Sequence, residues 1–334
     1  MNIVVCIDGL AEGWRGGATN VFKLFNMLED RTANQVAFYD VGAWFRPGIG
    51  VSELLRPGTG MSAKICRAYE FIFERFEAGD QIYLFGTGRG AATVALLAEM
   101  LHLFGVLPVG HKELIAKGYS IFNTRDPERR RRKAHGFVYS HHTMWCVVPF
   151  LGVWDTVLTR GHAVDELGYS GLGYKHYRPS LPHCVSNCYH ALAIDDERKA
   201  FHPRIWSPEI LPRQSMKQVW FSGMHADVGG GYQESALSDI SLRWMVKSAE
   251  RHGLRIYSHH GVREDPDPNG IMHDSFLGVG ARWYAREART WDVNAHGKPQ
   301  VHASVLDRRL NRHNADTSSY APWILDGDYE VESE

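Results

Sequence analysis

Mostly apolar runs with the character of buried strands alternate along the chain with segments of helical periodicity. These runs occupy residues 2–7, 35–41, 81–85, 145–154 and 218–221. Apolar runs of this length, rich in Val, Ile and aromatic residues, are typical of strands in a parallel sheet that is covered on both faces. The alternation of strands and helices therefore predicts an α/β fold with right-handed crossovers.

Helices are predicted between these strands from their caps and their apolar faces. Thr19-Asn20 is suited to cap a first helix, residues 62–76 form an amphipathic second one, and residues 91–103 are rich in Ala, Leu and Met. A further helix is expected around residues 188–200, and Ser238 caps another. These helices are expected to cover both faces of a mostly parallel sheet.

The remaining segments are expected to be insertions in a single domain over residues 1–325. Residues 106–143 are polar, basic and poorly periodic, and are predicted as an insertion or lid. Residues 160–182 are predicted as a second loop-rich stretch, and residues 326–334 as an acidic tail. With 334 residues and 44% hydrophobic content, the chain is large enough for one sizeable core.

The strand at residues 81–85 leads through a glycine-rich turn into the helix at 91–103. The turn reads Gly86-Thr87-Gly88-Arg89-Gly90. This is the layout of the nucleophile elbow, Gly-x-Ser-x-Gly, in which a sharp turn presents a serine hydroxyl at the start of a helix. The serine position holds Gly88, which has no nucleophile. Glycine-rich turns of this kind also hold phosphate groups, so a hydrolase elbow and an anion-binding turn are both open interpretations.

Polar residues follow three of the other predicted strands. They are Asp8-Gly9, Asp155-Thr156 and His225-Ala226-Asp227. Functional groups in open α/β sheets collect at the carboxyl ends of the strands. A serine hydrolase needs a nucleophile, an acid and a histidine, which follow in that order along an α/β-hydrolase chain. Position 88, Asp155 and His225 satisfy this order.

Other assignments of the acid and the base remain open. Asp227 competes with Asp155 as the acid, and His302 competes with His225 because the base often comes late in the chain. No metal or other cofactor is expected. A weaker alternative is a hydrolase assisted by a divalent cation at Asp8, Asp155, His225 and Asp227, since carboxylate and imidazole ligands suit such an ion.

An oxyanion hole would complete a hydrolase site. It needs two N–H groups that point at the oxygen on which negative charge develops. The first would be the backbone N–H of Arg89, directly after the nucleophile position, and the second would come from Gly9 or Leu10, after the first strand.

Charge and composition exclude some classes of protein. The chain has 37 Lys and Arg against 38 Asp and Glu, a formal charge of -1, so nucleic acid is not an expected partner. The basic run Arg129-Arg130-Arg131-Arg132-Lys133 is interpreted first as a solvated face and second as a lipid or phosphate contact, which includes a peripheral membrane contact. Five scattered cysteines and no recognisable leader or long apolar span predict a cytoplasmic protein, with export independent of a signal peptide left open.

Several motifs, in order, resemble those of one family. They are Asp8-Gly9 with Thr19-Asn20-Val21, Phe85-Gly86-x-x-Arg89-Gly90-Ala91, Gly152-Val153-Trp154-Asp155-Thr156-Val157, His190-Ala191-Leu192-Ala193-Ile194-Asp195, the segment from Trp220 to Tyr232, and Leu237-Ser238-Asp239-Ile240-Ser241-Leu242. Together they resemble the uncharacterised α/β-hydrolase family that includes the catalytic domain of type VI secretion phospholipase effectors. The resemblance runs from residue 3 to about 255, and His302-x-Ser304-Val305 is similar to the family's C-terminal segment.

The resemblance implies hydrolysis of ester bonds in phospholipids or other acyl esters, and so a place in lipid metabolism. It implies a serine at position 88, an acid at Asp155 and a base at His225, and, for an effector, a secretion or immunity partner. The family's Gly-x-Ser-Arg-Gly appears here with Gly88 for serine, and its Asp-Gly-Thr appears as Asp8-Gly9-Leu10. Either an esterase has lost its nucleophile, or the site has become a binding module.

Overall fold

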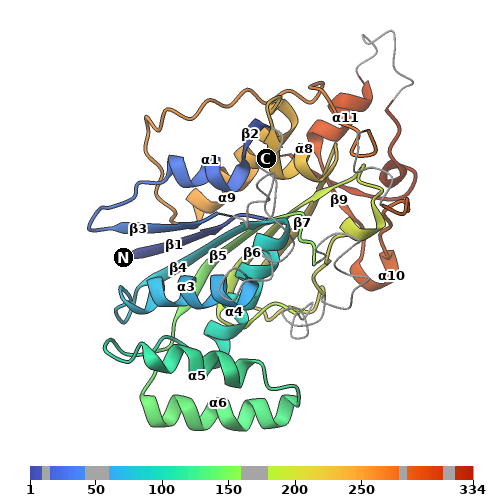
Figure 1. Cartoon of the computed structure of the whole chain (residues 1–334). Helices are drawn as coiled ribbons and strands as arrows, with labels where there is room; N and C mark the ends of the chain where they lie inside the picture. Colours follow the sequence, from blue (N-terminus) through green and yellow to red (C-terminus); the bar gives the residue numbers. More distant parts are fainter. Residues whose placement is uncertain (10–15, 42–59, 159–179, 278–283, 311–319, 334) are drawn as a thin grey trace, which may run out of the picture.

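The computed structural model describes residues 1–9, 16–41, 60–158, 180–277, 284–310 and 320–333 (Figure 1). Its centre is an eight-stranded sheet with the strand order β10-β9-β7-β6-β5-β4-β1-β3. The strands are β1 (Asn2–Ile7), β3 (Gln35–Asp40), β4 (Gln81–Thr87), β5 (Val147–Trp154), β6 (Val185–Ala193), β7 (Ser215–Phe221), β9 (Gln300–His302) and β10 (Glu330–Glu332). Every neighbouring pair is parallel, so the predicted α/β fold with a parallel sheet is confirmed.

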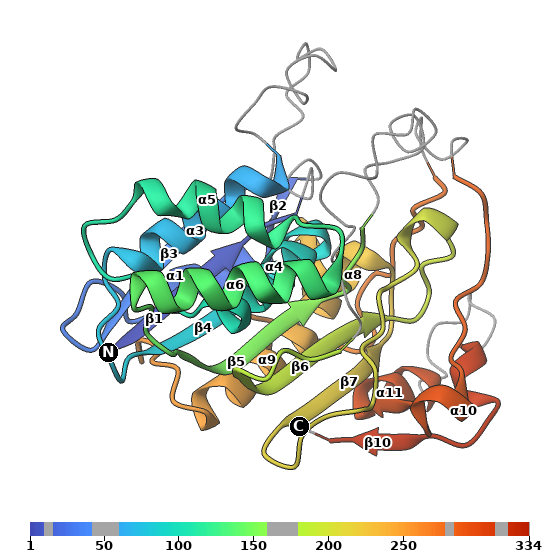
Figure 2. The same cartoon turned by 90° about the horizontal axis from the view of Figure 1, so that it is seen from below.

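Helices cover both faces of this sheet (Figures 1 and 2). One face carries α1 (Asn20–Met27) and α9 (Ala236–Arg251), and the other carries α3 (Met61–Phe73), α4 (Gly88–Phe104), α5 (Glu113–Phe122) and α6 (Pro127–His141). Successive side chains of a strand point to opposite faces. Val5 of β1 therefore packs in the core under α3 and α4, whereas Val4 packs in the core under α1 and α9.

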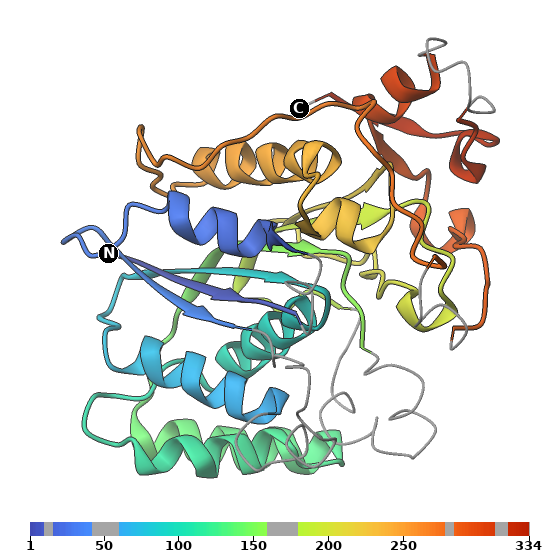
Figure 3. The same ribbon diagram turned by 45° about the horizontal axis from the view of Figure 1, so that its top comes forward.

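A third, smaller core lies at the edge of the sheet beyond β7 (Figure 3). It is built around Trp220 of β7, whose ring meets Trp291 and Trp323 edge to face. The elements here are α10 (Val293–His296), α11 (Ala303–Leu310), the 3-10 turn η5 (Trp323–Leu325) and strand β10. The expected acidic tail is therefore part of the sheet: Glu332 of β10 forms an ion pair with Lys217 of β7 at 2.8 Å.

Short elements stand at the carboxyl end of the sheet. They are β2 (Gly16–Thr19), the 3-10 turn η3 (Lys199–Phe201), α8 (His225–Gly229) and β8 (Gly230–Tyr232). Strands β2 and β8 form a separate antiparallel pair. These elements bring residues from early and late parts of the chain to the ends of β1, β4 and β5.

Two expectations differ from the structure. The helix expected around residues 188–200 is wrong, because Val185–Ala193 is strand β6, paired with β5 on one side and β7 on the other. The stretch 106–143, expected as an insertion or lid rather than core, contains α5 and α6, which pack on α3 and α4 and contribute Phe122 and Phe137 to the core. The loop-rich stretch 160–182 lies mostly outside the described residues.

Two further features concern the compartment and membranes. All five cysteines carry free thiols. Within the described part of the chain, no helix is both long and apolar enough to cross a membrane.

Candidate active site

The turn between β4 and α4, where the sequence predicts a nucleophile elbow, is tightly packed. β4 ends at Thr87 and α4 begins at Gly88, whose φ of 54° lies in the left-handed region. A Cβ on Gly90 would lie 2.0 Å from the carbonyl oxygen of Ile7, and one on Gly86 would lie 2.6 Å from backbone atoms of Gly90. Only glycine fits at these two positions, because at Gly90 the turn packs directly on the end of β1 and at Gly86 the turn folds back on its own backbone.

Thr87 does not replace the missing serine. Its side chain is fully buried, and a Cβ on Gly229 of α8 would lie 2.6 Å from its Oγ1. The hydroxyl therefore points into the contact between the elbow and α8. This contact also shows that α8, the helix that begins at His225, packs against the elbow.

Asp155 and His225 come together beside this turn. Asp155 follows β5 with a φ of 41°, a conformation that Asp tolerates better than most residues. Its Oδ2 lies 2.6 Å from Nδ1 of His225, and both side chains are buried. Two residues later, the N–H of Val157 donates to the carbonyl of Gly88 at 3.2 Å. The segment that carries Asp155 is thus hydrogen-bonded to the turn that carries Gly88.

Arg289 holds the carboxylate of Asp155 from the other side. Its Nη1 lies 2.6 Å from Asp155 Oδ1 and its Nη2 lies 2.9 Å from Oδ2. The guanidinium also donates to the carbonyls of Ala193, Asp196 and Phe201. Burial alone would raise the pKa of Asp155, but the charge and hydrogen bonds of Arg289, with those of His225, hold it well below its usual range. Asp155 is therefore ionised and accepts the Nδ1 proton of His225, which leaves Nε2 as the basic nitrogen.

The backbone of His225 is fixed by a second buried carboxylate. Asp196 Oδ2 accepts the N–H of His225 at 3.1 Å and also pairs with Arg198 at 2.5 Å. The ring of Phe201 meets the imidazole edge to face, with centroids 5.2 Å apart. Sequence reasoning missed Asp196, Phe201 and Arg289. For Asp196 a signal was present, because it follows directly on the motif that ends at Asp195.

The competing acid and base have other partners. Asp227 Oδ1 lies 2.6 Å from Nδ1 of His273, and its Oδ2 accepts the backbone N–H groups of Met224 and His273. His302 lies on β9, where its ring stacks on Phe221 and its Nδ1 lies 2.8 Å from Ser304 Oγ. Burial lowers the pKa of His302 to about 4. Of the two aspartates, Asp155 is therefore the one bonded to the His225 ring.

The expected oxyanion groups are only partly described. Asp8 is buried, and its Oδ2 accepts hydrogen bonds from Thr19 Oγ1 at 2.7 Å and from the Tyr39 hydroxyl at 2.5 Å. The N–H of Gly9 donates to Asp8 Oδ1 at 3.2 Å, and Leu10 lies outside the described residues. The N–H of Arg89 belongs to the first turn of α4, where backbone N–H groups have no partner within the helix.

The weaker alternative of a cation site is not supported by these positions. Asp155 and His225 form one pair, Asp227 binds His273, and Asp8 binds Thr19 and Tyr39. Across the described ranges, no three His, Cys, Asp or Glu side chains gather in a way that suits a metal ion. The residues proposed as ligands therefore occupy three different sets of contacts.

Comparison with known proteins decides the family. The model of the catalytic domain of Tle1-like phospholipase effectors of type VI secretion systems matches residues 1–248. The chain belongs to this family. The family is one of lipase- or esterase-type hydrolase domains. The residues matched by the Tle1-like model include the elbow, Asp155 and His225, and they end before Arg289.

Individual relatives are more distant. The uncharacterized protein YEL023C of Saccharomyces cerevisiae is 32% identical over 236 residues, which cover 62% of this chain and 33% of the yeast protein. The chain thus spans about a third of the length of that relative. A solved structure of an uncharacterized protein from Pseudomonas aeruginosa has 15% identity and a TM-score of 0.46, covering 80% of this chain and 49% of that chain. The Tle1 effector bound to the VgrG spike has 16% identity and a TM-score of 0.34, covering 70% and 51%.

Proposed function

We propose that this chain has the acid and base of a serine esterase or phospholipase, and that Gly88 occupies the position of its nucleophile. The observation that carries the proposal is the 2.6 Å contact between Asp155 and His225, buried next to the left-handed turn at Gly88. A site that had lost its function altogether would have little reason to keep a buried ion pair around its acid, because burying charges is costly.

The reaction would follow from this geometry once residue 88 carries a hydroxyl. His225 Nε2 would take the proton of the hydroxyl as its oxygen attacks the ester carbonyl, and would then give that proton to the leaving alcohol. Asp155 would stabilise the imidazolium in between. The negative oxygen of the intermediate would be held by the N–H of Arg89. With Gly88 no acyl-enzyme can form, and we expect the present chain to retain a rate enhancement over water of about 10³–10⁴ at most.

The test is the Gly88→Ser variant, assayed with short acyl esters and with phospholipid vesicles. We expect kcat/KM to rise by at least about a hundredfold, because the nucleophile is the group whose removal costs most in such sites. The φ of 54° strains any residue but glycine by about 1–2 kcal/mol. Gly88→Ala is therefore the matched control, since it carries the same strain without a hydroxyl.

Two outcomes separate the interpretations. If Gly88→Ser hydrolyses no faster than Gly88→Ala while both stay folded, the esterase proposal is rejected. If Gly88→Ser is active and the additional change His225→Ala abolishes the gain, the roles proposed for residue 88 and His225 are supported. The comparison of acyl esters with phospholipids then selects the substrate class.

A second candidate, an anion-binding module at the Gly86–Gly90 turn, is favoured by one observation. Lys64 is buried close to the turn, with its Nζ 3.1 Å from the carbonyl of Asp8. Burial lowers the pKa of Lys64 to about 8; the nearby charge of Asp40 opposes this, and that of Arg89 adds to it. An anion at the turn would relieve the repulsion between the two cations. Calorimetric titration with inorganic phosphate tests this candidate, and absence of heat at millimolar phosphate would reject it.

A further inference from the structure

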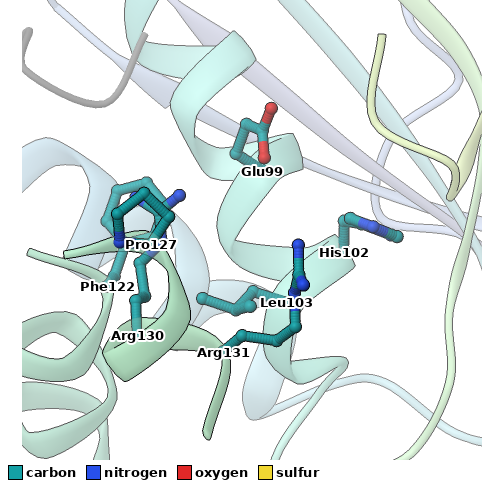
Figure 4. Close-up of a pocket in the computed structure, with 7 residues that line it drawn as sticks. All are labelled: Glu99, His102, Leu103, Phe122, Pro127, Arg130 and Arg131. Carbon is teal, nitrogen blue, oxygen red and sulfur yellow. The ribbon is translucent and has the colours of Figure 1, made fainter. Parts of the chain in front are cut away.

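A groove between α4 and α6 takes no part in the Asp155–His225 site. Its α4 residues lie between Glu99 and Phe104, in the C-terminal half of a helix that begins at Gly88. At 1.5 Å per residue, this half lies about 16–24 Å along the helix axis from the elbow. Figure 4 shows side chains of α4, the end of α5 and the first turns of α6 around one part of the groove.

The groove has two contiguous compartments of different character. The smaller, about 130 Å³, is lined by Glu99, Phe122, Pro127 and Arg130 and by three residues of a wall that it shares with the larger compartment, among them Arg131. The larger, about 350 Å³, is mainly apolar and includes Phe104, Ala134, Val138 and Trp145. His102, Leu103 and Arg131 line both. The larger volume lies at the lower end of the range for small-molecule sites.

The shared wall contains a polar atom without a partner. Nδ1 of His102 is buried and has no hydrogen-bond partner among the described residues. The ring lies 4.9 Å from the ring of His183 and 6.3 Å from the ring of Trp145, centroid to centroid. Buried polar atoms in native proteins are nearly always hydrogen-bonded. A ligand polar group could pair with this nitrogen only after a rotation of the His102 ring toward the groove, so the charges and the apolar lining, rather than this nitrogen, support binding in the groove.

The charges of the smaller compartment favour an anion. Two guanidinium groups, of Arg130 and Arg131, and one carboxylate, that of Glu99, belong to residues that line this compartment. Arg131 contacts Glu128 at 3.1 Å, but both side chains are largely exposed. Exposed pairs of this kind are weak, so an anion can displace Glu128 at little cost. Once Glu128 is displaced, the residues that line the compartment carry a net positive charge next to an apolar slot.

We propose that this groove binds a single-chain anionic amphiphile, with its acyl chain along Phe104, Val138 and Trp145 and its anionic head at Arg130 and Arg131. A fatty acid and a lysophospholipid share this chemistry: one apolar chain with a carboxylate or phosphate head. The groove is formed without residue 88, so the proposal does not depend on hydrolysis. It assigns a specific role to part of the basic run, which otherwise lies on the solvent side of α6.

The test is calorimetric titration of the unmodified chain with laurate and with a short-chain lysophosphatidylglycerol, each below its micellar concentration. We expect saturable binding of one molecule per chain for at least one of them, and the comparison distinguishes a carboxylate from a phosphate head. Dodecyltrimethylammonium, with the same chain and the opposite charge, is expected to bind at least about tenfold more weakly, since a charge-assisted contact contributes about that much. Equal binding of the cationic amphiphile would overturn the proposal.

Basic residues of α6 that lie outside the groove provide controls matched in charge. Arg131→Ala is expected to weaken binding about tenfold, whereas Arg132→Ala and Lys133→Ala, with the same charge change outside both compartments, are expected to change it less than twofold. If the three variants lose affinity equally, binding is a general electrostatic effect and the site is rejected. If only anionic vesicles bind and no monomeric amphiphile does, α6 contacts a membrane surface and the groove proposal is rejected.

A second measurement locates the acyl chain of the bound amphiphile and uses a substitution that preserves an aromatic side chain. Laurate brominated on its chain quenches the fluorescence of a tryptophan in contact with it. We expect quenching by bound laurate to fall strongly in Trp145→Phe, which keeps an aromatic ring in the apolar compartment. If this substitution leaves the quenching unchanged, the acyl chain lies elsewhere and the proposal is contradicted.

Discussion

Two histidine–aspartate pairs lie close together in this molecule, and they share the same distance. His225 Nδ1 lies 2.6 Å from Asp155, and His273 Nδ1 lies 2.6 Å from Asp227, whose position is two residues after His225. Their surroundings differ. Asp155 accepts two hydrogen bonds from a buried arginine, whereas Asp227 accepts two backbone N–H groups and caps the start of α8.

The surroundings shift the pKa values of the two carboxyl groups in opposite directions. Burial would raise the pKa of Asp155, but Arg289 and His225 lower it far below the usual range. Burial raises the pKa of Asp227, and the N–H of Met224 and the contacts of His273 offset this only in part. A short distance between an imidazole and a carboxylate therefore does not by itself identify an acid–base pair. The electrostatic partner behind the carboxylate decides whether it stays charged.

The largest expected effect separates the two aspartates by activity. In the Gly88→Ser background, Asp155→Asn is expected to lower kcat by about 10⁴-fold, because an amide favours the wrong tautomer of His225. Asp227→Asn is expected to lower it less than about tenfold, since an amide oxygen can still accept the N–H of Met224. Ester hydrolysis at saturating substrate measures both. Equal losses would show that Asp227 contributes to the reaction as much as Asp155.

The next effect concerns stability and the arginine behind Asp155. Arg289→Met leaves the carboxylate of Asp155 buried without its cation, and such losses typically cost about 3–5 kcal/mol. Urea unfolding followed by circular dichroism measures the change. Arg286→Met is the control, because Arg286 pairs with Glu197 at the surface and its loss is expected to move the midpoint little. If the two variants unfold alike, Arg289 is not needed to hold Asp155.

The elbow and the pair beside it could be predicted from sequence because their signals are local. Gly86 and Gly90 are required by contacts with the adjacent backbone, so their spacing is visible in the chain. Asp155 and His225 each follow an apolar strand, so both strand ends can be recognised in the chain, and the structure brings these two side chains together. Arg289 has no such signal: it reaches Asp155 from a segment without regular structure, 134 residues further along the chain.

The error at β6 has a different cause. Val185–Ala193 contains Ser, Asn and His among Ala and Leu, so it lacks the apolar continuity of β1 or β5. The strand forms because β5 and β7 pair with both of its edges, and its buried His190 accepts the N–H of Thr156 at 3.1 Å. Long-range pairing overrode local propensity here. The local sequence of residues 185–193 gives no sign of that pairing.

The smallest effect tests the opposite shifts of the two aspartates through pH. Between the unfolded pKa of about 3.9 and the raised pKa of Asp227, the folded protein binds more protons than the unfolded one, so Asp227 makes stability fall as pH rises. Asp155 has the opposite sign: its lowered pKa contributes stability above about pH 4 that is lost as pH falls further. As pH rises from 4 to 7, the free energy of unfolding is therefore expected to fall less in Asp227→Asn than in the unmodified chain. The difference between the two slopes is expected to be below about 1.4 kcal/mol per pH unit. Burial also raises the pKa of Asp195, to about 6, and the charge of Asp227 adds a smaller contribution; Asp227→Asn removes that contribution, which acts in the same direction as the loss of Asp227 itself. Urea unfolding at several pH values gives that difference, and a curve with the reverse slope would show that Asp227, like Asp155, is held as an anion by its surroundings.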